Sequence, residues 1–278
     1  MACLTDQRWQ RTLRRHFDRA ASTYAGHAGV QRQSADAWLA RWQTADAPTG
    51  RVLDLGCGSG YLACALASWP DVEHLLAVDL SEGMLRGPDW RPSPVLTRLC
   101  ADASALPLAT ASIDVAISHF ALHWCPSPTQ VFAELRRVLR PDGVAQVVIP
   151  VAGSLSGRVD APPDDETLRP LSVWREAVAS AGWQVVAEEV VTQGEYHADA
   201  RAWLTALRAM GVTARRDAPA GLSGRARLQA LLRRLEALRE PEGIPLRYQL
   251  WQARLTPVPH GLMILSEARR NEPCPHFS

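Results

Sequence analysis

The stretch that decides the fold reads Arg51-Val-Leu-Asp-Leu-Gly-Cys-Gly-Ser-Gly60. Residues 51–55 are mostly apolar and predict a strand, and residues 61–68 predict a helix. Between them, Asp54 is followed by Gly56, Gly58 and Gly60, so small residues let the backbone approach a ligand at the carboxyl end of the strand. The dinucleotide-binding fingerprint G-x-G-x-x-G has a different spacing, so this loop favours S-adenosylmethionine over NAD.

Strand and helix patterns alternate after this loop. Apolar runs predict further strands, and helical patterns lie between most of them; the predicted strands are 75–80, 95–102, 113–118, 144–149, 183–191 and 246–255. Such alternation indicates βαβ units with helices on both faces of a sheet. We therefore expect an α/β, Rossmann-like class I methyltransferase fold with a mostly parallel seven-stranded sheet.

The rest of the chain divides around this sheet. Helical periodicity within residues 1–46 predicts N-terminal lid helices, and residues 47–197 with 241–255 form the predicted cofactor-binding domain. Residues 198–240 predict a helical cap inserted before the last strand. No role is assigned to the tail, residues 256–278.

Acidic residues stand at three successive strand ends. Asp54 can accept hydrogen bonds from amino groups of a ligand, and Asp79 can accept both hydroxyls of a ribose. Asp102 is placed to accept a hydrogen bond from the adenine amine, while Ala103 donates its backbone N–H to a ring nitrogen. Met84 can pack on the adenine ring. Each acid alone could be a helix cap or a solvated side chain, but together they predict an S-adenosylmethionine site.

A segment at the end of the fourth predicted strand is expected to face the transferable methyl group. It reads Ser118-His-Phe-Ala-Leu-His-Trp124. His119 and His123 allow two interpretations, an acid/base role or simple packing against a ligand. We count His119 among the cofactor contacts. Trp124 is a hydrophobic wall under either interpretation.

Composition excludes some partners. The 30 cationic side chains other than histidine are all Arg, and with 29 acids they leave a net charge of +1, which argues against a nucleic-acid or membrane partner. The six cysteines form no C-x-x-C pair, so we expect reduced thiols and no metal. Neither a leader sequence nor a membrane span is recognisable, which predicts a cytoplasmic protein.

With these residues assembled, the chain resembles the malonyl-acyl carrier protein O-methyltransferases of biotin synthesis. The stretches that carry this resemblance are 17–24, 30–36, the Gly-rich loop, 106–109, 121–124 and 207–213. The resemblance implies methylation of the free carboxylate of a malonyl thioester, on an acyl carrier protein or coenzyme A. Tyr24, Arg208 and Trp124 would then be catalytic, Arg208 by holding the carboxylate.

Three departures from the family pattern are visible. His119 follows Ser118 where relatives commonly have Asn, the segment after Leu155 is short, and the tail has no counterpart. Two alternatives stay open: a class I methyltransferase acting on another small acid or a quinone ring carbon, and a non-catalytic protein that binds S-adenosylmethionine. An acidic carrier protein could dock on the arginines of residues 224–239 or on Arg11, Arg14 and Arg15.

Overall fold

A seven-stranded sheet forms the centre of the computed structural model, which describes residues 2–43, 45–155, 168–210 and 224–259. The strand order is β3-β2-β1-β4-β5-β7-β6. The first five strands in this order are parallel, and β7 is antiparallel to both neighbours. This order confirms the predicted fold class. The strands are β1 Gly50–Leu55, β2 Val72–Asp79, β3 Leu96–Cys100, β4 Ile113–His119, β5 Leu139–Pro150, β6 Trp183–His197 and β7 Ile244–Pro257.

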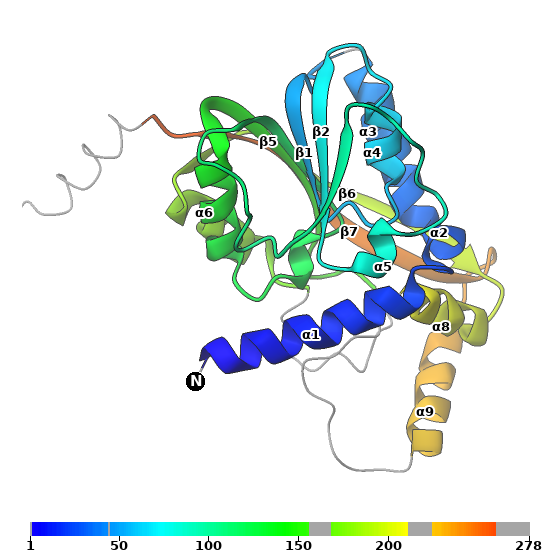
Figure 1. Ribbon diagram of the computed structural model, residues 1–278. Helices are drawn as coiled ribbons and strands as arrows, with labels where there is room; N and C mark the ends of the chain where they lie inside the picture. The colour runs from blue at the N-terminus through cyan, green and yellow to red at the C-terminus, as the bar shows by residue number, and fades with distance from the viewer. Residues whose placement is uncertain (1, 44, 156–167, 211–223, 260–278) are drawn as a thin grey trace, which may run out of the picture.

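Helices cover both faces of the sheet (Figure 1). On one face, α3 (Gly29–Trp42) and α4 (Tyr61–Leu66) contribute apolar side chains to a core that includes Val52. On the other, α6 (Pro128–Val138) and α7 (Leu171–Ser180) pack on a core that includes Leu53. Successive residues of β1 therefore enter opposite cores, as the two-residue period of a strand requires.

Two strands extend five or more residues beyond one of their predicted ends. β5 begins at Leu139, directly after α6, and β6 continues to His197, where we had expected an end at Val191. The extra residues of β6 pair with β7 up to His197 opposite Ile244. They are polar or exposed because β6 is the edge strand, so no apolar run marks them.

The remaining helices lie at the carboxyl edge of the parallel strands. They are α1 (Ala2–Ala20), α2 (Tyr24–His27), α5 (Glu82–Leu85), α8 (Ala200–Ala209) and α9 (Gly224–Glu236). The two predicted N-terminal helices are thus α1 and α3, joined by the short α2. In Figure 1, α1 crosses below the sheet, and it packs beside α5. Within the described residues, no helix has the length and apolar character to cross a membrane. The segment after Leu155 and most of the tail lie outside the described residues.

Candidate cofactor and acceptor site

The loop after β1 adopts a backbone conformation that requires glycine. Gly56 has a φ of 77° and donates its N–H to the backbone oxygen of Val78 at 2.7 Å. A Cβ atom on Gly56 would lie 2.1 Å from that of Ala121, closer than two atoms can approach. Gly58, with a φ of 54°, donates its N–H to Oδ2 of Asp79 at 2.9 Å. The glycines therefore let β1, β2 and the segment after β4 meet at one point.

Asp54 and Asp79 are the charged groups beneath this loop. The Asp54 side chain is only 2% exposed, and its Oδ2 has no hydrogen-bond partner among the described residues. Burial, with a smaller contribution from the Asp79 charge, raises the pKa of Asp54 to about 7. Burial also raises the pKa of Asp79, although its carboxylate accepts the N–H groups of Gly58 and Ser81. The pair therefore favours a cationic ligand.

Met84 lies in α5, the short helix after β2, and Asp102 follows the end of β3. Met84 is almost fully buried, and its N–H is capped by the Ser81 hydroxyl at 3.2 Å. Asp102 accepts hydrogen bonds from Ser104 and from the side chain of Gln10, the latter at 2.5 Å. Gln10 belongs to α1, so the N-terminal helix reaches the third acidic position.

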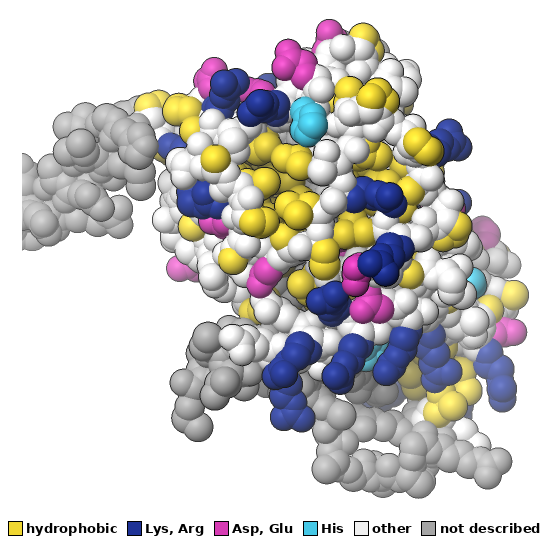
Figure 2. All heavy atoms as spheres, in the orientation of Figure 1, with side chains coloured by type: hydrophobic (Ala, Val, Ile, Leu, Met, Phe, Trp, Pro, Cys, Tyr) yellow, Lys and Arg dark blue, Asp and Glu magenta, His cyan; other side chains and the backbone are white. Residues whose placement is uncertain are grey.

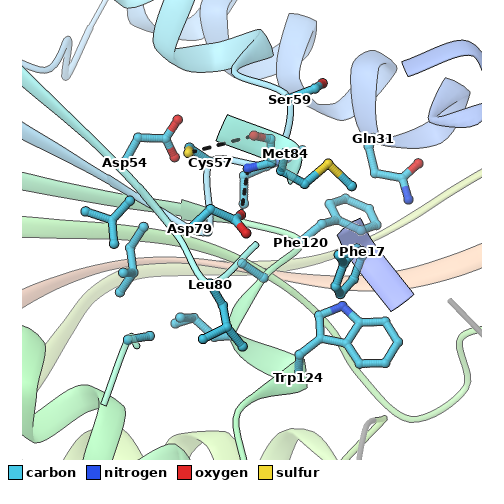
Figure 3. A pocket seen from close by; sticks show the side chains of 18 of the residues that line it. Phe17, Gln31, Asp54, Cys57, Ser59, Asp79, Leu80, Met84, Phe120 and Trp124 are labelled. Atoms are coloured by element: carbon cyan, nitrogen blue, oxygen red, sulfur yellow. Dashed lines mark hydrogen bonds between the residues drawn. The ribbon is translucent and has the colours of Figure 1, made fainter. Parts of the chain in front are cut away.

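A large cavity brings most of the predicted cofactor residues together (Figure 3). Its lining includes Asp54, Gly56, Gly58, Asp79, Met84, Asp102, Ala103 and His119. Gly60 is not part of that lining. It precedes α4 with a φ of 86°, and a Cβ there would lie 2.7 Å from the Trp90 ring, so its role in this conformation is to form the turn.

The wall of the cavity includes residues of α1 that the sequence analysis did not assign. Leu13 and Phe17 line it, and Phe17 makes an edge-to-face contact with Trp124 at 5.5 Å between ring centroids. Trp9 donates its indole N–H to the backbone oxygen of Trp124 at 3.1 Å. Phe17 begins one of the stretches that carry the family resemblance, and that was the only sequence signal for this wall.

A second, smaller cavity adjoins the first. The two share Phe17, Tyr24, Gln31, Phe120 and Trp124, and in Figure 3 the labelled members of this set lie across the cavity from Asp54. The second cavity is otherwise lined by His123, Leu155, Leu168, Met210 and Tyr248. No Asp, Glu or Arg is among these described lining residues, and the polar side chains of the lining include Tyr24, Gln31, His123 and Tyr248.

Gln31 is the polar group at the junction of the two cavities. Its side-chain nitrogen lies 3.5 Å from the sulfur of Met210, and its buried Oε1 has no hydrogen-bond partner among the described residues. A buried amide oxygen without a hydrogen-bond partner destabilises the folded protein. This position therefore suits a ligand that supplies a hydrogen-bond partner. The sequence analysis placed Gln31 in a resemblance stretch but gave it no role.

Tyr24 lines both cavities from α2. Burial and the Asp79 charge raise its pKa to about 12, so the phenol stays protonated at neutral pH and can donate a hydrogen bond. The preceding residue, Thr23, donates its hydroxyl to the backbone oxygen of Ala209 at 3.0 Å. That bond connects the start of α2 to the end of α8.

The two histidines occupy different cavities. His119 lines the larger one, and its Nε2 lies 3.0 Å from the hydroxyl of Ser34. Burial lowers its pKa to about 3, so this imidazole is neutral at physiological pH. His123, only 7% exposed, lines the smaller cavity.

Arg208 does not join these residues. It is exposed on α8 and lines neither cavity, although Met210, two residues later, lines the second. Its proposed contact with a carboxylate would require the side chain to turn inward. The side chains of Arg225 and Arg227, also considered as a docking patch, lie outside the described residues.

Comparison with known proteins agrees with this geometry. Residues 53–147 match the family model described as "Methyltransferase domain". A putative methyltransferase from Bacillus halodurans matches the fold with a TM-score of 0.58 and 19% identity, covering 78% of this chain and 97% of that one. The YcgJ protein of Bacillus subtilis matches with a TM-score of 0.55 and 18% identity, covering 80% and 97%. These structures establish the fold.

Relatives with higher sequence identity include several proteins named malonyl-[acyl-carrier protein] O-methyltransferase. The protein so named from Alcanivorax borkumensis is 36% identical in an alignment 247 positions long, which covers 84% of this chain and 82% of that protein. The one from Methylovorus sp. is 31% identical in an alignment 273 positions long, which covers 90% of this chain and 92% of that protein. Identity above 30% over most of both chains shows that this chain belongs to the malonyl-[acyl-carrier protein] O-methyltransferase family.

Proposed function

We propose that this protein transfers the methyl group of S-adenosylmethionine to the free carboxylate of a malonyl thioester carried by an acyl carrier protein, in biotin synthesis. The observation that carries the proposal is the pair of adjoining cavities, one lined by carboxylates at the strand ends and one mostly apolar, in a chain of this family. Malonyl-coenzyme A is a second candidate substrate. A cytoplasmic location remains a prediction from the sequence.

The residues of the larger cavity fit S-adenosylmethionine. The Oδ2 of Asp54, which has no hydrogen-bond partner among the described residues, suits an ammonium group. A Cβ on Gly58 would have only the Tyr24 ring nearby, at 3.9 Å, so this glycine leaves the cavity open beside the loop. Asp79 would accept the ribose hydroxyls, Met84 would pack on the adenine, and Asp102 with Ala103 would recognise its edge. His119 would add a contact from the end of β4. Bound there, the cofactor supplies an electrophilic methyl group on a sulfonium.

No general base is needed for this reaction. A malonyl carboxylate has a pKa near 4 and is ionised at neutral pH, so its oxygen is already a nucleophile. His119, with its low pKa, is neutral and hydrogen-bonded to Ser34, which is consistent with a packing role. What the protein must supply is position and exclusion of water.

Residues shared by the two cavities would supply that position. The Tyr24 hydroxyl can donate to a carboxylate oxygen, and the Gln31 amide lies at the same junction. Trp124, Phe17 and Phe120 would keep water from the reacting atoms. We retain Arg208 as a proposed second ligand of the carboxylate, because a desolvated anion needs donors in exchange for water.

The test is product formation by the purified chain. Malonyl-carrier protein incubated with S-adenosylmethionine should gain one methyl group by mass spectrometry, and fragmentation of the product should place that methyl group on the malonyl moiety. Acetyl-carrier protein, which lacks the free carboxylate, is the control and should be unchanged. Methylation of a quinone or a small free acid, with none of malonyl-carrier protein, would support the alternative methyltransferases. Binding without any transfer would support a non-catalytic protein.

A further inference from the structure

The outer face of α1 carries a row of arginines that the proposed reaction does not use. Arg8, Arg11, Arg15 and Arg19 are all exposed, and Figure 2 shows dark-blue side chains gathered in a row over this helix. Their spacings of three, four and four residues place them on one side of a helix. We call these four residues the α1 arginine row.

The row is not neutralised by neighbouring acids. None of its four residues forms an ion pair with an acid in the described part of the chain, and Arg11 donates instead to the backbone oxygen of Gln7. Arg14, on the adjacent side of the helix, differs: it pairs with Asp18 at 3.9 Å and Glu82 at 3.7 Å. Those contacts connect α1 to α5, whereas the row points away from the protein.

The opposite face of the same helix forms the cofactor cavity. Leu13 and Phe17 line that cavity, and Trp9 and Leu13 pack with Trp124. Asp18 fixes the helix further, because its Oδ1 accepts the Ser81 hydroxyl at 2.6 Å and the Gly83 N–H at 2.9 Å. One helix therefore holds a positive surface about 16 Å long, from residue 8 to residue 19, on the outside of the wall of the cavity.

We infer that the α1 arginine row is the docking surface for an acidic helix of the carrier protein that delivers the acyl group, which rests on the proposed function. Exposed like charges on one helix face repel one another, so they do not stabilise the free protein. Their positive charge is complementary to an acidic partner. Docking there leaves the bound carrier one helix away from the two cavities. A membrane surface is a poorer match, since the apolar side chains of α1 face inward.

The experiment compares two substrates and three variants. Arg11→Glu/Arg15→Glu reverses the centre of the row, Arg233→Glu/Arg234→Glu makes the same change on exposed positions of α9, and Arg51→Glu alters the opposite edge of the sheet. We expect the first variant alone to raise KM for malonyl-carrier protein on the order of tenfold, with kcat and KM for malonyl-coenzyme A unchanged. The rise should shrink as salt is added.

Four outcomes would overturn the inference. An unchanged KM for the carrier substrate, or an equal rise for both substrates, would remove the docking role while leaving the proposed function in place. A larger rise for the α9 variant would place docking on α9. If binding of the wild type to vesicles of anionic lipid were abolished by Arg11→Glu/Arg15→Glu while carrier KM was unaffected, the row would be a membrane contact. Failure of the wild type to methylate either substrate would instead reject the proposed function itself.

Discussion

The two adjoining cavities of the candidate site differ in the elements that line them. The larger has a volume of about 150 Å³ and is lined by carboxylates and glycines at the ends of parallel strands. The smaller has a volume of about 30 Å³ and is lined by aromatic, aliphatic and amide side chains. Most of its lining comes from α1, α2, α3, the segment after β4 and the chain around α8, and Tyr248 of β7 is its contribution from the sheet.

This difference separates two tasks of a methyltransferase. Cofactor binding rests on the sheet, whose edge is rigid because every strand is hydrogen-bonded to its neighbours. Acceptor selection rests on helices attached to that edge by a few contacts, such as the Thr23 to Ala209 hydrogen bond. We therefore expect substitutions in the first group to change cofactor affinity, and substitutions in the second to change acceptor kinetics while cofactor affinity is kept.

The largest expected effect is a loss of catalytic efficiency on substitution of Arg208, the proposed ligand of the acceptor carboxylate. If its guanidinium turns inward to hold the carboxylate, Arg208→Ala should lose on the order of a hundredfold in kcat/KM, about 3 kcal/mol. Cofactor affinity and melting temperature should not change, and Arg208→Lys should recover only part of the loss. Arg201→Ala, on an exposed position of the same helix, is the matched control. Normal efficiency in the Arg208 variant would leave Gln31 and Tyr24 as the remaining polar candidates.

A substitution of Asp79 tests the role of the larger cavity in cofactor binding. Asp79→Ala should weaken binding of both S-adenosylmethionine and S-adenosylhomocysteine by roughly 1 to 3 kcal/mol, measured by calorimetry, because a pair of charge-assisted hydrogen bonds is lost. Asp114→Ala is the control, since Asp114 accepts the Arg51 N–H on the other edge of the sheet. NAD should bind neither the wild type nor the variants. Unchanged affinity for both ligands would remove Asp79 from the ribose site.

The buried carboxyl of Asp54 predicts a dependence of cofactor affinity on pH. Its pKa of about 7 means that much of it is protonated in the free protein at pH 6, while a cationic ligand prefers the ionised form. Affinity should therefore fall about tenfold between pH 8 and pH 6, and binding should release protons near pH 7. Asp54→Asn should bind more weakly and without this dependence. Calorimetry in buffers of different ionisation enthalpy measures the proton release, and its absence in the wild type would contradict the assignment.

The same carboxyl affects stability with a definite sign. A folded-state pKa raised from 3.8 to about 7 means that the folded protein holds this proton more tightly than the unfolded chain. Its contribution is fully present below pH 4 and is lost as pH rises through 7. Without cofactor, Asp54→Asn should gain melting temperature relative to the wild type at pH 8 but not at pH 4.

The smallest expected effect concerns Tyr24. Tyr24→Phe should lower turnover several-fold with little change in melting temperature, because one hydrogen bond to the acceptor is lost while the ring still fills the junction. Tyr196→Phe removes a phenol that bonds to Glu240 on the edge strand and serves as the control. A Tyr24 variant with normal turnover but weaker cofactor binding would move Tyr24 from the acceptor side to the cofactor side.

Several parts of the site were predictable from sequence because they depend on local order. Residues Asp54, Asp79 and Asp102 follow apolar runs, and parallel strands bring their carboxyl ends to one edge whatever else surrounds them. The spacing of the glycines was also visible in the sequence, because positive φ angles in the loop favour glycine. The position of Gly60 outside the cavity was not predictable, because it depends on the Trp90 ring from another loop.

The sequence by itself determined the sheet, the glycine loop and the acids at its edge, because these follow from periodicity and from backbone conformations that only certain residues adopt. Only the tertiary structure decided that Gln10 meets Asp102, that Gln31 lies between two cavities, and that Arg208 faces outward while an unpaired arginine row covers α1. Those outcomes depend on how helices dock on the finished sheet. The contacts join residues as far apart as 92 positions for Gln10 and Asp102 and 179 for Gln31 and Met210, and no local pattern encodes them.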